Sequence, residues 1–450
     1  METLRVSSYM IPVKLEKENG KYMLIHGYTG AIDVITENLL QQIKQTNAHN
    51  NLSEKTLQTL INRGYLTYKT EEEEYAYVTR IAQALHKKAR IISKSFTLVI
   101  TYNCNFRCPY CFEERESKDN IQQFSFTREM ADKVFHAMDL IEPNRVLRNN
   151  IISLYGGEPL LKENKEIVSY IVKEGQKKGY RFSATTNGYD LEYFLDLLAE
   201  DAICKIQITI DGMKETHNQR RIHFKENNTF DKIIFNIHLA LEKNIIVQIR
   251  VNTDHYNINE FISLKNLFEQ LGFTQYKKFG FYSTLIQNND AITIEEKKKL
   301  DFLPIKDFFH NHNNMETISH CHDYGVFKKV QNAITENKPI NFRSTFCPSQ
   351  SGGYVFDPFG KIYPCWEVIG QRDNQLGNYL NNKIEWNNEV IQKWHSYDIG
   401  NSSKCKHCER ALLCGGGCIA HIHNQKNNHC IYFKQAFETA VNRAYERLNI

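Results

Sequence analysis

Three closely spaced cysteines could together bind one iron–sulfur cluster. Cys104, Cys108 and Cys111 are separated by three and then two residues, so one short loop could wrap three thiolates around a cubane. Three thiolates leave one of the cubane's irons without a protein ligand, and that iron can chelate a small molecule through amino and carboxylate groups. A structural zinc site needs four closed ligands, so a zinc knuckle here would have to borrow a distant fourth ligand.

Seven more cysteines follow a second pattern nearer the carboxyl terminus. They are Cys347, Cys365, Cys405, Cys408, Cys414, Cys418 and Cys430. Ten of the twelve cysteines therefore fall into two groups, and clustered cysteines in a reducing compartment indicate metal ligands rather than disulfides. Cys-x2-Cys pairs also bind zinc commonly, so on spacing alone a two-zinc ribbon is an alternative for the second group.

The first cysteine group follows a predicted strand in a region where strands and helices alternate. The predicted strands are Ser95–Thr101, Ile151–Tyr155, Phe182–Thr186, Lys205–Ile210 and Ile245–Asn252. The predicted helices between them include Thr127–Leu140, Glu166–Lys178 and Phe230–Lys243. Repeated strand–helix units imply a parallel sheet, open or closed into a barrel. Enzymes of this type place their chemistry at the carboxyl ends of the strands. Cys204 precedes a predicted buried strand and is interpreted as a core residue.

The residues before this region predict a small winged-helix module. Two predicted strands, Tyr9–Leu15 and Tyr22–His26, flank Asn19-Gly20, which is a strong hairpin signal. The predicted helices and the short wing strand are Asp33–Gln45, Ser53–Arg63, Glu72–Lys88 and Leu66–Tyr68. We expect the acidic run Glu71–Glu74 to be a solvated helix start, where negative charge suits the helix dipole.

Length and composition limit the remaining possibilities. A chain of 450 residues predicts two to four domains, and we place them at 1–92, 93–300 and 341–450, with a connecting segment at 301–340. The last domain ends in a helix from about Phe433 to Leu448. A net charge of +4 gives no nucleic-acid stripe, and no run approaches the roughly 20 apolar residues of a membrane helix. The sequence also shows no secretory signal, so we expect a cytoplasmic location and neither nucleic acid nor a membrane as a partner.

The first cysteine group resembles the signature of the radical S-adenosylmethionine (SAM) superfamily, and further motifs support this resemblance in the order expected. Tyr110 supplies the aromatic residue before the last cysteine. The other matching segments are Gly156-Gly157-Glu158-Pro159, Thr185-Thr186-Asn187-Gly188, Ile210-Asp211-Gly212, His217 with Arg221, and Arg250 with Asn252. The resemblance implies an α/β fold, a partial (β/α)6 barrel similar to a TIM barrel.

The resemblance also implies cofactors and their ligands. Cys104, Cys108 and Cys111 would hold a [4Fe–4S] cluster that binds SAM on its open iron. The residues implied in SAM binding are Tyr110, Gly156, Gly157, Glu158, Asn187, Arg221 and Asn252. One electron from the cluster would cleave SAM to methionine and a 5′-deoxyadenosyl radical, which takes a hydrogen atom from the substrate. No side chain stands out as a catalytic acid or base; Asp211 is interpreted as a SAM-pocket or turn residue.

The second cysteine group resembles the SPASM domain, a carboxyl-terminal extension of some radical SAM enzymes that binds two auxiliary [4Fe–4S] clusters. The resemblance implies that the outer cluster is held by Cys405, Cys408, Cys414 and Cys430. It assigns Cys347, Cys365 and Cys418 to the inner cluster. No cysteine lies between Cys347 and Cys365, where some relatives have another. The inner cluster therefore has an open iron for a substrate thiolate or takes its fourth ligand from elsewhere, with Cys321 as a candidate that is otherwise a loop thiol.

SPASM relatives include maturases of ribosomally made peptides and anaerobic sulfatase maturases, and the amino-terminal module distinguishes these two classes. Segments 21–33 and 63–67 resemble maturases of ribosomally made peptides, in which a winged helix grips a leader peptide. These features predict a radical SAM peptide maturase that takes hydrogen from a precursor peptide and forms a thioether or another cross-link. An electron donor such as flavodoxin or ferredoxin is implied. The alternatives are a sulfatase-maturase-like enzyme that oxidises a serine or cysteine, a non-catalytic zinc-binding protein, and, for the module alone, a cap without a ligand.

Overall fold

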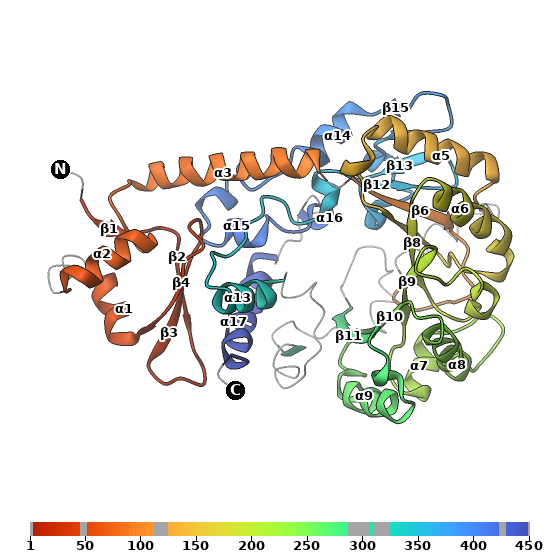
Figure 1. Cartoon of the computed structure of the whole chain (residues 1–450), viewed down its shortest axis with the longest axis horizontal. Helices are drawn as coiled ribbons and strands as arrows, with labels where there is room; N and C mark the ends of the chain where they lie inside the picture. The colour runs from red at the N-terminus through yellow and green to blue at the C-terminus, as the bar shows by residue number, and fades with distance from the viewer. Residues whose placement is uncertain are drawn as a thin grey trace. The chain divides into compact units, whose positions relative to one another are not determined.

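A computed structural model describes residues 3–45, 52–92, 94–111, 125–286, 307–308, 325–422 and 429–448 (Figure 1). The chain divides into two compact units. The first unit is Met1–Ile91 with His320–Ser351 and Lys393–Ile450, and the second is Ile92–Ser319 with Gly352–Gln392. Cys321 lies outside the described residues, as does most of the predicted connecting segment.

The second unit is built on a ten-stranded, mostly parallel sheet in the order β11-β10-β9-β8-β7-β6-β12-β13-β14-β15. Its parallel strands β6 to β11 are Ser95–Thr101, Ile151–Gly156, Arg181–Thr186, Ile203–Thr209, Ile246–Thr253 and Phe279–Leu285. The first five confirm the predicted strands, and β11 is a sixth that the sequence did not predict. Cys204 lies inside β9 and is buried, which confirms it as a core residue. The α/β fold with a partial parallel barrel is confirmed.

Helices cover the outer side of this curved sheet (Figure 1). They are α5 Arg128–Ile141, α6 Lys165–Lys177, α7 Lys214–Arg220, α8 Phe230–Leu241 and α9 Phe261–Gln270. The hydroxyl of Thr127 caps α5 by accepting a hydrogen bond from the Met130 N–H. Side chains alternate along these strands. In β10, Val247 and Ile249 are buried, whereas Gln248 between them is half-buried. One face of the sheet is therefore apolar, and the other carries polar side chains.

Four short strands from the predicted SPASM region extend the same sheet. They are β12 Gly353–Phe356, β13 Lys361–Tyr363, β14 Gly377–Asn378 and β15 Glu385–Trp386. β12 pairs in parallel with β6, so that Gly353 lies opposite Ser95 and Phe356 opposite Leu98. This pairing explains why residues 352–392 group with the second unit, while the segments on either side of them group with the first.

The first unit begins with an antiparallel sheet, β2 Met10–Lys14, β3 Lys21–His26 and β4 Ile32–Thr36, in the order β2-β3-β4. β1 Arg5–Val6 pairs with the wing strand β5 Leu66–Thr67, and the helices are α1 Glu37–Lys44, α2 Glu54–Arg63 and α3 Glu71–Ile91. The predicted helix from Asp33 is wrong in its first residues. The β-branched residues of Ile32–Thr36 pair with β3, and the Thr36 hydroxyl then caps α1 by accepting a hydrogen bond from the Leu39 N–H.

The acidic start of α3 is not solvated throughout, contrary to expectation. Glu74 is buried, and its carboxylate accepts hydrogen bonds from Arg5 Nη2 (2.6 Å), Ser7 Oγ (2.5 Å) and Tyr28 Oη (2.9 Å). Burial opposes ionisation of Glu74, but these donors outweigh it and lower its pKa. Glu74 therefore ties α3 to the strand region of the module.

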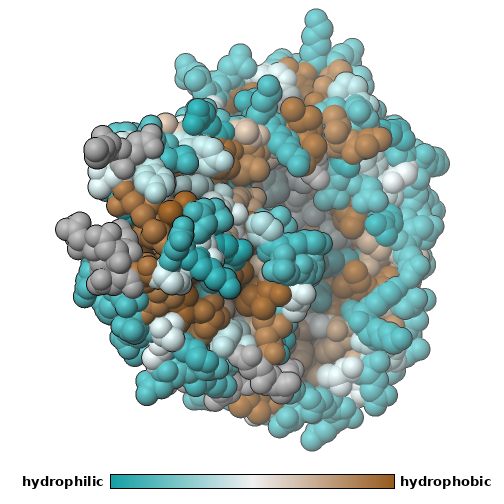
Figure 2. Space-filling model, turned by 60° about the vertical axis from the view of Figure 1, so that its left-hand side comes forward, coloured by the Kyte–Doolittle hydropathy of each residue, from teal (hydrophilic) through white to brown (hydrophobic). Residues whose placement is uncertain are grey.

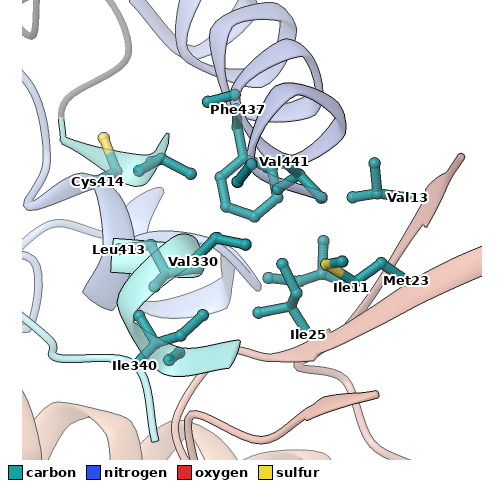
Figure 3. Close-up of a cluster of buried hydrophobic side chains, with 14 of the residues drawn as sticks. Ile11, Val13, Met23, Ile25, Val330, Ile340, Leu413, Cys414, Phe437 and Val441 are labelled. Carbon is teal, nitrogen blue, oxygen red and sulfur yellow. The ribbon is translucent and has the colours of Figure 1, made fainter. Parts of the chain in front are cut away.

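The two ends of the chain share one hydrophobic core in the first unit. Ile11 and Ile25 from β2 and β3 pack with Val330 of α13 (Val326–Thr335) and with Phe437 and Val441 of α17 (His429–Glu446) (Figure 3). The final helix confirms the one expected from about Phe433. Because this core needs residues from both ends, removing the amino-terminal module would expose the apolar face of α17.

The surface gives no sign of a membrane span in the part of the chain that the structure describes. No helix there combines the length and the apolar character that crossing a bilayer requires. On the face shown in Figure 2, hydrophilic side chains are interspersed with smaller hydrophobic areas.

Candidate active site and cysteine clusters

The loop after β6 brings the first three predicted cluster ligands together. Cys108 is buried, and Cys104 and Cys111 are half-buried. Burial raises the pKa of the Cys104 thiol, and the charges of Glu158, Cys108 and Cys111 raise it further. Three thiols in mutual electrostatic contact suit a positively charged metal cluster, because iron binds them as thiolates and removes this repulsion.

The glycine turn after β7 lies directly against the cysteine loop. The Gly157 N–H donates to the Thr101 carbonyl (2.9 Å) and the Glu158 N–H to the Asn103 carbonyl (2.8 Å). A Cβ atom on Gly156 would lie 2.3 Å from the Thr101 oxygen, and one on Gly157 would lie 2.5 Å from the Asn103 oxygen. Gly156 also has a φ of +131°, which favours glycine. Both glycines are therefore required by contact with the loop, and their expected contact with SAM stays a prediction.

Glu158 fastens this turn to the carboxyl end of β8. Its buried carboxylate accepts hydrogen bonds from the Thr186 hydroxyl (2.6 Å), the Asn187 N–H (2.5 Å) and the Leu160 N–H (2.9 Å). Burial raises the pKa of Glu158 to about 7, although these donors favour the ionised form. Glu158 thus joins the ends of β7 and β8, and its expected contact with SAM stays a prediction.

Asn187 completes the connection between β8 and the cysteine loop. Its Nδ2 donates to Asn105 Oδ1 (2.6 Å) and lies 4.0 Å from Cys104 Sγ. Its Oδ1 accepts a hydrogen bond from the Tyr189 N–H (2.9 Å). The predicted site residue Asn187 is therefore next to the first cluster ligand.

Tyr110 joins the same loop to the ends of β9 and β10. Its hydroxyl donates to the buried carboxylate of Asp211 and accepts hydrogen bonds from Arg221 Nη1 (3.2 Å) and Asn252 Nδ2 (3.2 Å). The Asn252 N–H also donates to Asp211 Oδ1 (3.2 Å). One hydrogen-bonded network thus joins three residues predicted to contact SAM, which are Tyr110, Arg221 and Asn252. The buried carboxylate of Asp211 accepts hydrogen bonds in the same network.

Arg221 has the features expected of a carboxylate-binding residue. Burial opposes its charge, but Cys108, Tyr110 and Asp211 outweigh that effect and raise its pKa. Its Nε atom is buried and has no hydrogen-bond partner among the described residues. The Nε2 atom of His217 is orphaned in the same way. The Nε atom of the neighbouring Arg220 also has no hydrogen bond, but it lies 3.7 Å from Asp211 Oδ2. Buried donors without partners are costly, so this end of the sheet fits an anionic group such as the SAM carboxylate.

The four cysteines predicted for the outer cluster gather in the first unit. Burial raises the pKa of Cys405, Cys408 and Cys414, and each of these thiols also interacts with others of the set. Cys430, at the start of α17 and exposed, interacts with Cys405 and Cys408. Four thiols from three segments are therefore close enough for their charges to interact, which is compatible with their being ligands of one cubane.

The inner set is divided between the units. Cys347 and Cys418 belong to the first and Cys365 to the second, so their assignment to one cluster stays a prediction. Over the described ranges, no group of three His, Cys, Asp or Glu side chains is placed to hold a single metal ion. Ligands of a cubane bind different irons and need not converge on one point.

His86 of α3 positions the segment that carries Cys347, a role that the sequence did not reveal. His86 Nδ1 lies 2.9 Å from Asp398 Oδ2, and its Nε2 lies 3.1 Å from the Gln350 carbonyl. The Gln350 side chain in turn accepts hydrogen bonds from the N–H groups of Phe346 (2.7 Å) and Cys347 (3.2 Å). Both ring nitrogens face acceptors, an arrangement that the doubly protonated, cationic form of His86 satisfies best.

Residues 98–268 match the radical SAM superfamily, over the region in which the cysteine loop, the glycine turn and the Tyr110 network meet. The chain therefore contains a radical SAM domain over these residues.

Among individual proteins, the chain is 22% identical to a cysteine-type anaerobic sulfatase-maturating enzyme of Clostridium novyi, over 78% of this chain and 96% of that enzyme. It is 21% identical to the radical SAM cyclopropyl synthase TigE of Paramaledivibacter caminithermalis, over 99% of this chain and 96% of TigE. Its fold resembles that of Streptococcus suis SuiB bound to SAM, with a TM-score of 0.52, 15% identity and coverage of 94% and 97% of the two chains.

Replacing Tyr110 with phenylalanine should weaken the site. The change leaves the Asp211 carboxylate without the phenolic donor and removes the acceptor of Arg221 and Asn252. We expect the free energy of unfolding to fall by about 1–3 kcal/mol and SAM to bind less tightly, as measured by urea denaturation and equilibrium dialysis. Tyr193→Phe, at a tyrosine that is 49% exposed, is the matched control. Equal results for the two variants would contradict the role of the Tyr110 hydroxyl.

The His86–Asp398 pair should make stability depend on pH. Burial opposes protonation of His86, but its hydrogen bonds to Asp398 and Gln350 outweigh it and raise the pKa above 6.5. A raised histidine pKa means that the stabilisation is fully present below pH 6.5 and is lost as pH rises through the folded-state pKa. We expect the free energy of unfolding of wild type to fall over that rise, measured by urea denaturation at a series of pH values. His86→Gln should lack this component; an unchanged pH profile in the variant would contradict the assignment.

Proposed function

We propose that this chain is a maturase that modifies a ribosomally made precursor peptide by abstracting a hydrogen atom from one of its carbons. The product is a cross-link, and a cysteine-to-carbon thioether is favoured if the inner auxiliary cluster binds a substrate thiolate. The observation that carries the proposal is a radical SAM site in a chain that also has an amino-terminal module with an open sheet edge. Likeness to TigE over 99% of this chain and to SuiB, whose structure was also solved with its precursor peptide SuiA, supports it.

The residues fit the cofactors that this chemistry needs. Bound to Cys104, Cys108 and Cys111, a [4Fe–4S] cluster with SAM on its open iron supplies the 5′-deoxyadenosyl radical that takes the hydrogen atom. Arg221 provides a buried cation with an orphaned donor for the SAM carboxylate. The Gly156–Gly157 turn and Glu158 hold the ends of β7 and β8 together beside the cysteine loop.

The seven cysteines of the second group would hold two auxiliary [4Fe–4S] clusters. The mutual contacts of Cys405, Cys408, Cys414 and Cys430 support the outer cluster. Reduction of the clusters would come from a flavodoxin or ferredoxin, and clustered thiols of this kind suit the reducing cytoplasm.

The leader peptide would bind along β4. This strand is at the edge of the three-stranded sheet, whereas the opposite edge strand, β2, meets Asn442 of α17, whose Nδ2 donates to the Lys14 carbonyl (3.1 Å). In the β3–β4 ladder, Asp33 and Ile35 face β3, so the N–H and C=O of Val34 point outward. Val34 is 43% exposed. An extended peptide could therefore pair with β4 as a fourth strand and be bound through backbone hydrogen bonds.

A sulfatase-maturase-like activity is the second candidate, because the Clostridium novyi enzyme matches 78% of this chain. Such an enzyme would oxidise a serine or cysteine of its substrate and would not need the β4 edge. Deleting the amino-terminal module cannot distinguish the two, since its strands β2 and β3 supply part of the core around Phe437. A substitution on β4 can distinguish the two activities.

Val34→Pro should weaken binding of the precursor peptide, because proline lacks the outward N–H that an added strand would use. We expect about fivefold weaker binding for the loss of a hydrogen bond of about 1 kcal/mol. The measurement uses synthetic candidate precursors taken from short reading frames near this chain's gene, with binding followed by fluorescence anisotropy and product by mass spectrometry. Wild type should convert the peptide to a product that lacks two hydrogen atoms.

Val34→Thr is the matched control, because threonine keeps the N–H and the β-branched shape, and it should bind as wild type does. SAM cleavage without peptide should be equal in all three proteins. Conversion of a serine or cysteine peptide at the same rate in wild type and Val34→Pro would instead favour the sulfatase-maturase-like activity and contradict the leader site.

A further inference from the structure

Arg343 connects the two groups of predicted auxiliary-cluster ligands within the first unit. Its Nε donates to the carbonyl of Leu413 (3.1 Å), and its Nη1 donates to the carbonyl of Phe346 (3.4 Å). Leu413 immediately precedes Cys414, and Phe346 immediately precedes Cys347. One guanidinium group therefore holds the backbone beside a ligand of the outer cluster and beside a ligand of the inner cluster.

The same two segments approach each other as closely as their backbones allow. A Cβ atom on Gly415 would lie 2.5 Å from the Thr345 oxygen and 2.9 Å from the Phe346 nitrogen. Gly415 has a φ of +78°, so glycine is needed there for both conformation and space. The Arg343 N–H adds a further link by donating to the Leu412 carbonyl (2.8 Å). Arg343 is therefore fixed where the two segments meet.

Arg343 also acts electrostatically on both cysteines. Burial raises the pKa of the Cys347 and Cys414 thiols, and in each case the charge of Arg343 opposes that rise. A second cation, Lys329 of α13, directly precedes Val330, which packs in the same hydrophobic core as Cys414. The charge of Lys329 interacts with those of Cys414 and Arg343. Arg410 interacts with Cys408, is paired with Glu409 and lies 3.8 Å from Glu438.

We propose that Arg343 is a shared positioning residue whose positive charge raises the reduction potential of both auxiliary clusters, and that Lys329 adds to this effect at the outer cluster alone. The inference rests on the proposed function, which supplies the two clusters. A reduced cluster carries one more negative charge than the oxidised cluster, so a nearby fixed cation stabilises the reduced form. Both clusters would therefore accept an electron more readily than they would without the cation.

The test is a redox titration of the full chain, followed by electron paramagnetic resonance. Cys104, Cys108 and Cys111 are first replaced with alanine, so that only auxiliary clusters contribute to the signal. At the potential where each cluster of this parent is half-reduced, Arg343→Gln should lower the reduced-to-oxidised ratio of both clusters about tenfold. This change corresponds to 59 mV for a one-electron couple.

Two further variants separate charge from structure. Arg343→Lys keeps the charge but loses the fork of donors, and its ratios should stay within about threefold of the parent. Lys329→Gln should lower the ratio of one cluster and leave the other unchanged. Unshifted ratios in Arg343→Gln, or equal shifts in Arg343→Gln and Arg343→Lys, would overturn the proposal.

Loading with iron distinguishes the remaining outcomes. If the parent chain binds no iron, the auxiliary clusters of the proposed function are absent. The iron content of the parent is measured before any variant is titrated. If Arg343→Gln fails to load its clusters while the parent and Lys329→Gln load theirs, the titration of Lys329→Gln is decisive. A change in the reduced-to-oxidised ratio of one cluster supports the proposed charge effect, and an unchanged ratio in both clusters overturns it.

Discussion

The direct backbone contact between the cysteine loop and the turn after β7 is the constraint on which the active site depends. Thr101 and Asn103 accept hydrogen bonds from Gly157 and Glu158, and any side chain on Gly156 or Gly157 would push these segments apart. The carboxylate of Glu158 then fixes β8 to the same turn. The cluster ligands are thereby held by the sheet itself, so small changes in strand packing would move the cluster.

A second constraint operates in the first unit, where both ends of the chain contribute to one structure. The core around Phe437 contains residues of β2 and β3 as well as α13 and α17, and Cys414 lies at its border (Figure 3). His86 of α3 is bonded to the segment that carries Cys347. The proposed leader-binding module and the proposed auxiliary-cluster ligands are thus parts of one cooperative unit, in which loss of either part would disturb the other.

Local patterns predicted much of the fold, and pairings distant in sequence were the main failures. Strand runs such as Ser95–Thr101 have the same bounds in the structure, because short runs of β-branched and apolar residues favour strands. Strand β4 was mistaken for the start of a helix since its apolar residues continue into α1. β12 could not be placed because its partner, β6, is more than two hundred residues away. Glu74 looked solvated because its donors lie on β1 and in the loops after it and after β3.

The same distinction applies to the candidate site. Motifs identified Tyr110, Arg221 and Asn252, and the structure places them in one hydrogen-bonded network. Arg343 and His86 carry no motif, and their roles depend on contacts with residues far along the chain. A signal for Gly415 was present in the run of three glycines between Cys414 and Cys418, whose positive φ values only the structure reveals.

Metal content combined with SAM cleavage tests the central claim most directly. Protein purified and reconstituted without oxygen should contain about twelve irons per chain, four for each cubane, and should release 5′-deoxyadenosine when dithionite is added. The release should disappear when Cys104, Cys108 and Cys111 are all replaced with alanine, and it should persist in Cys204→Ala, which alters a buried core thiol. Zinc without iron, together with no cleavage of SAM, would contradict the assignment of this chain as a radical SAM enzyme.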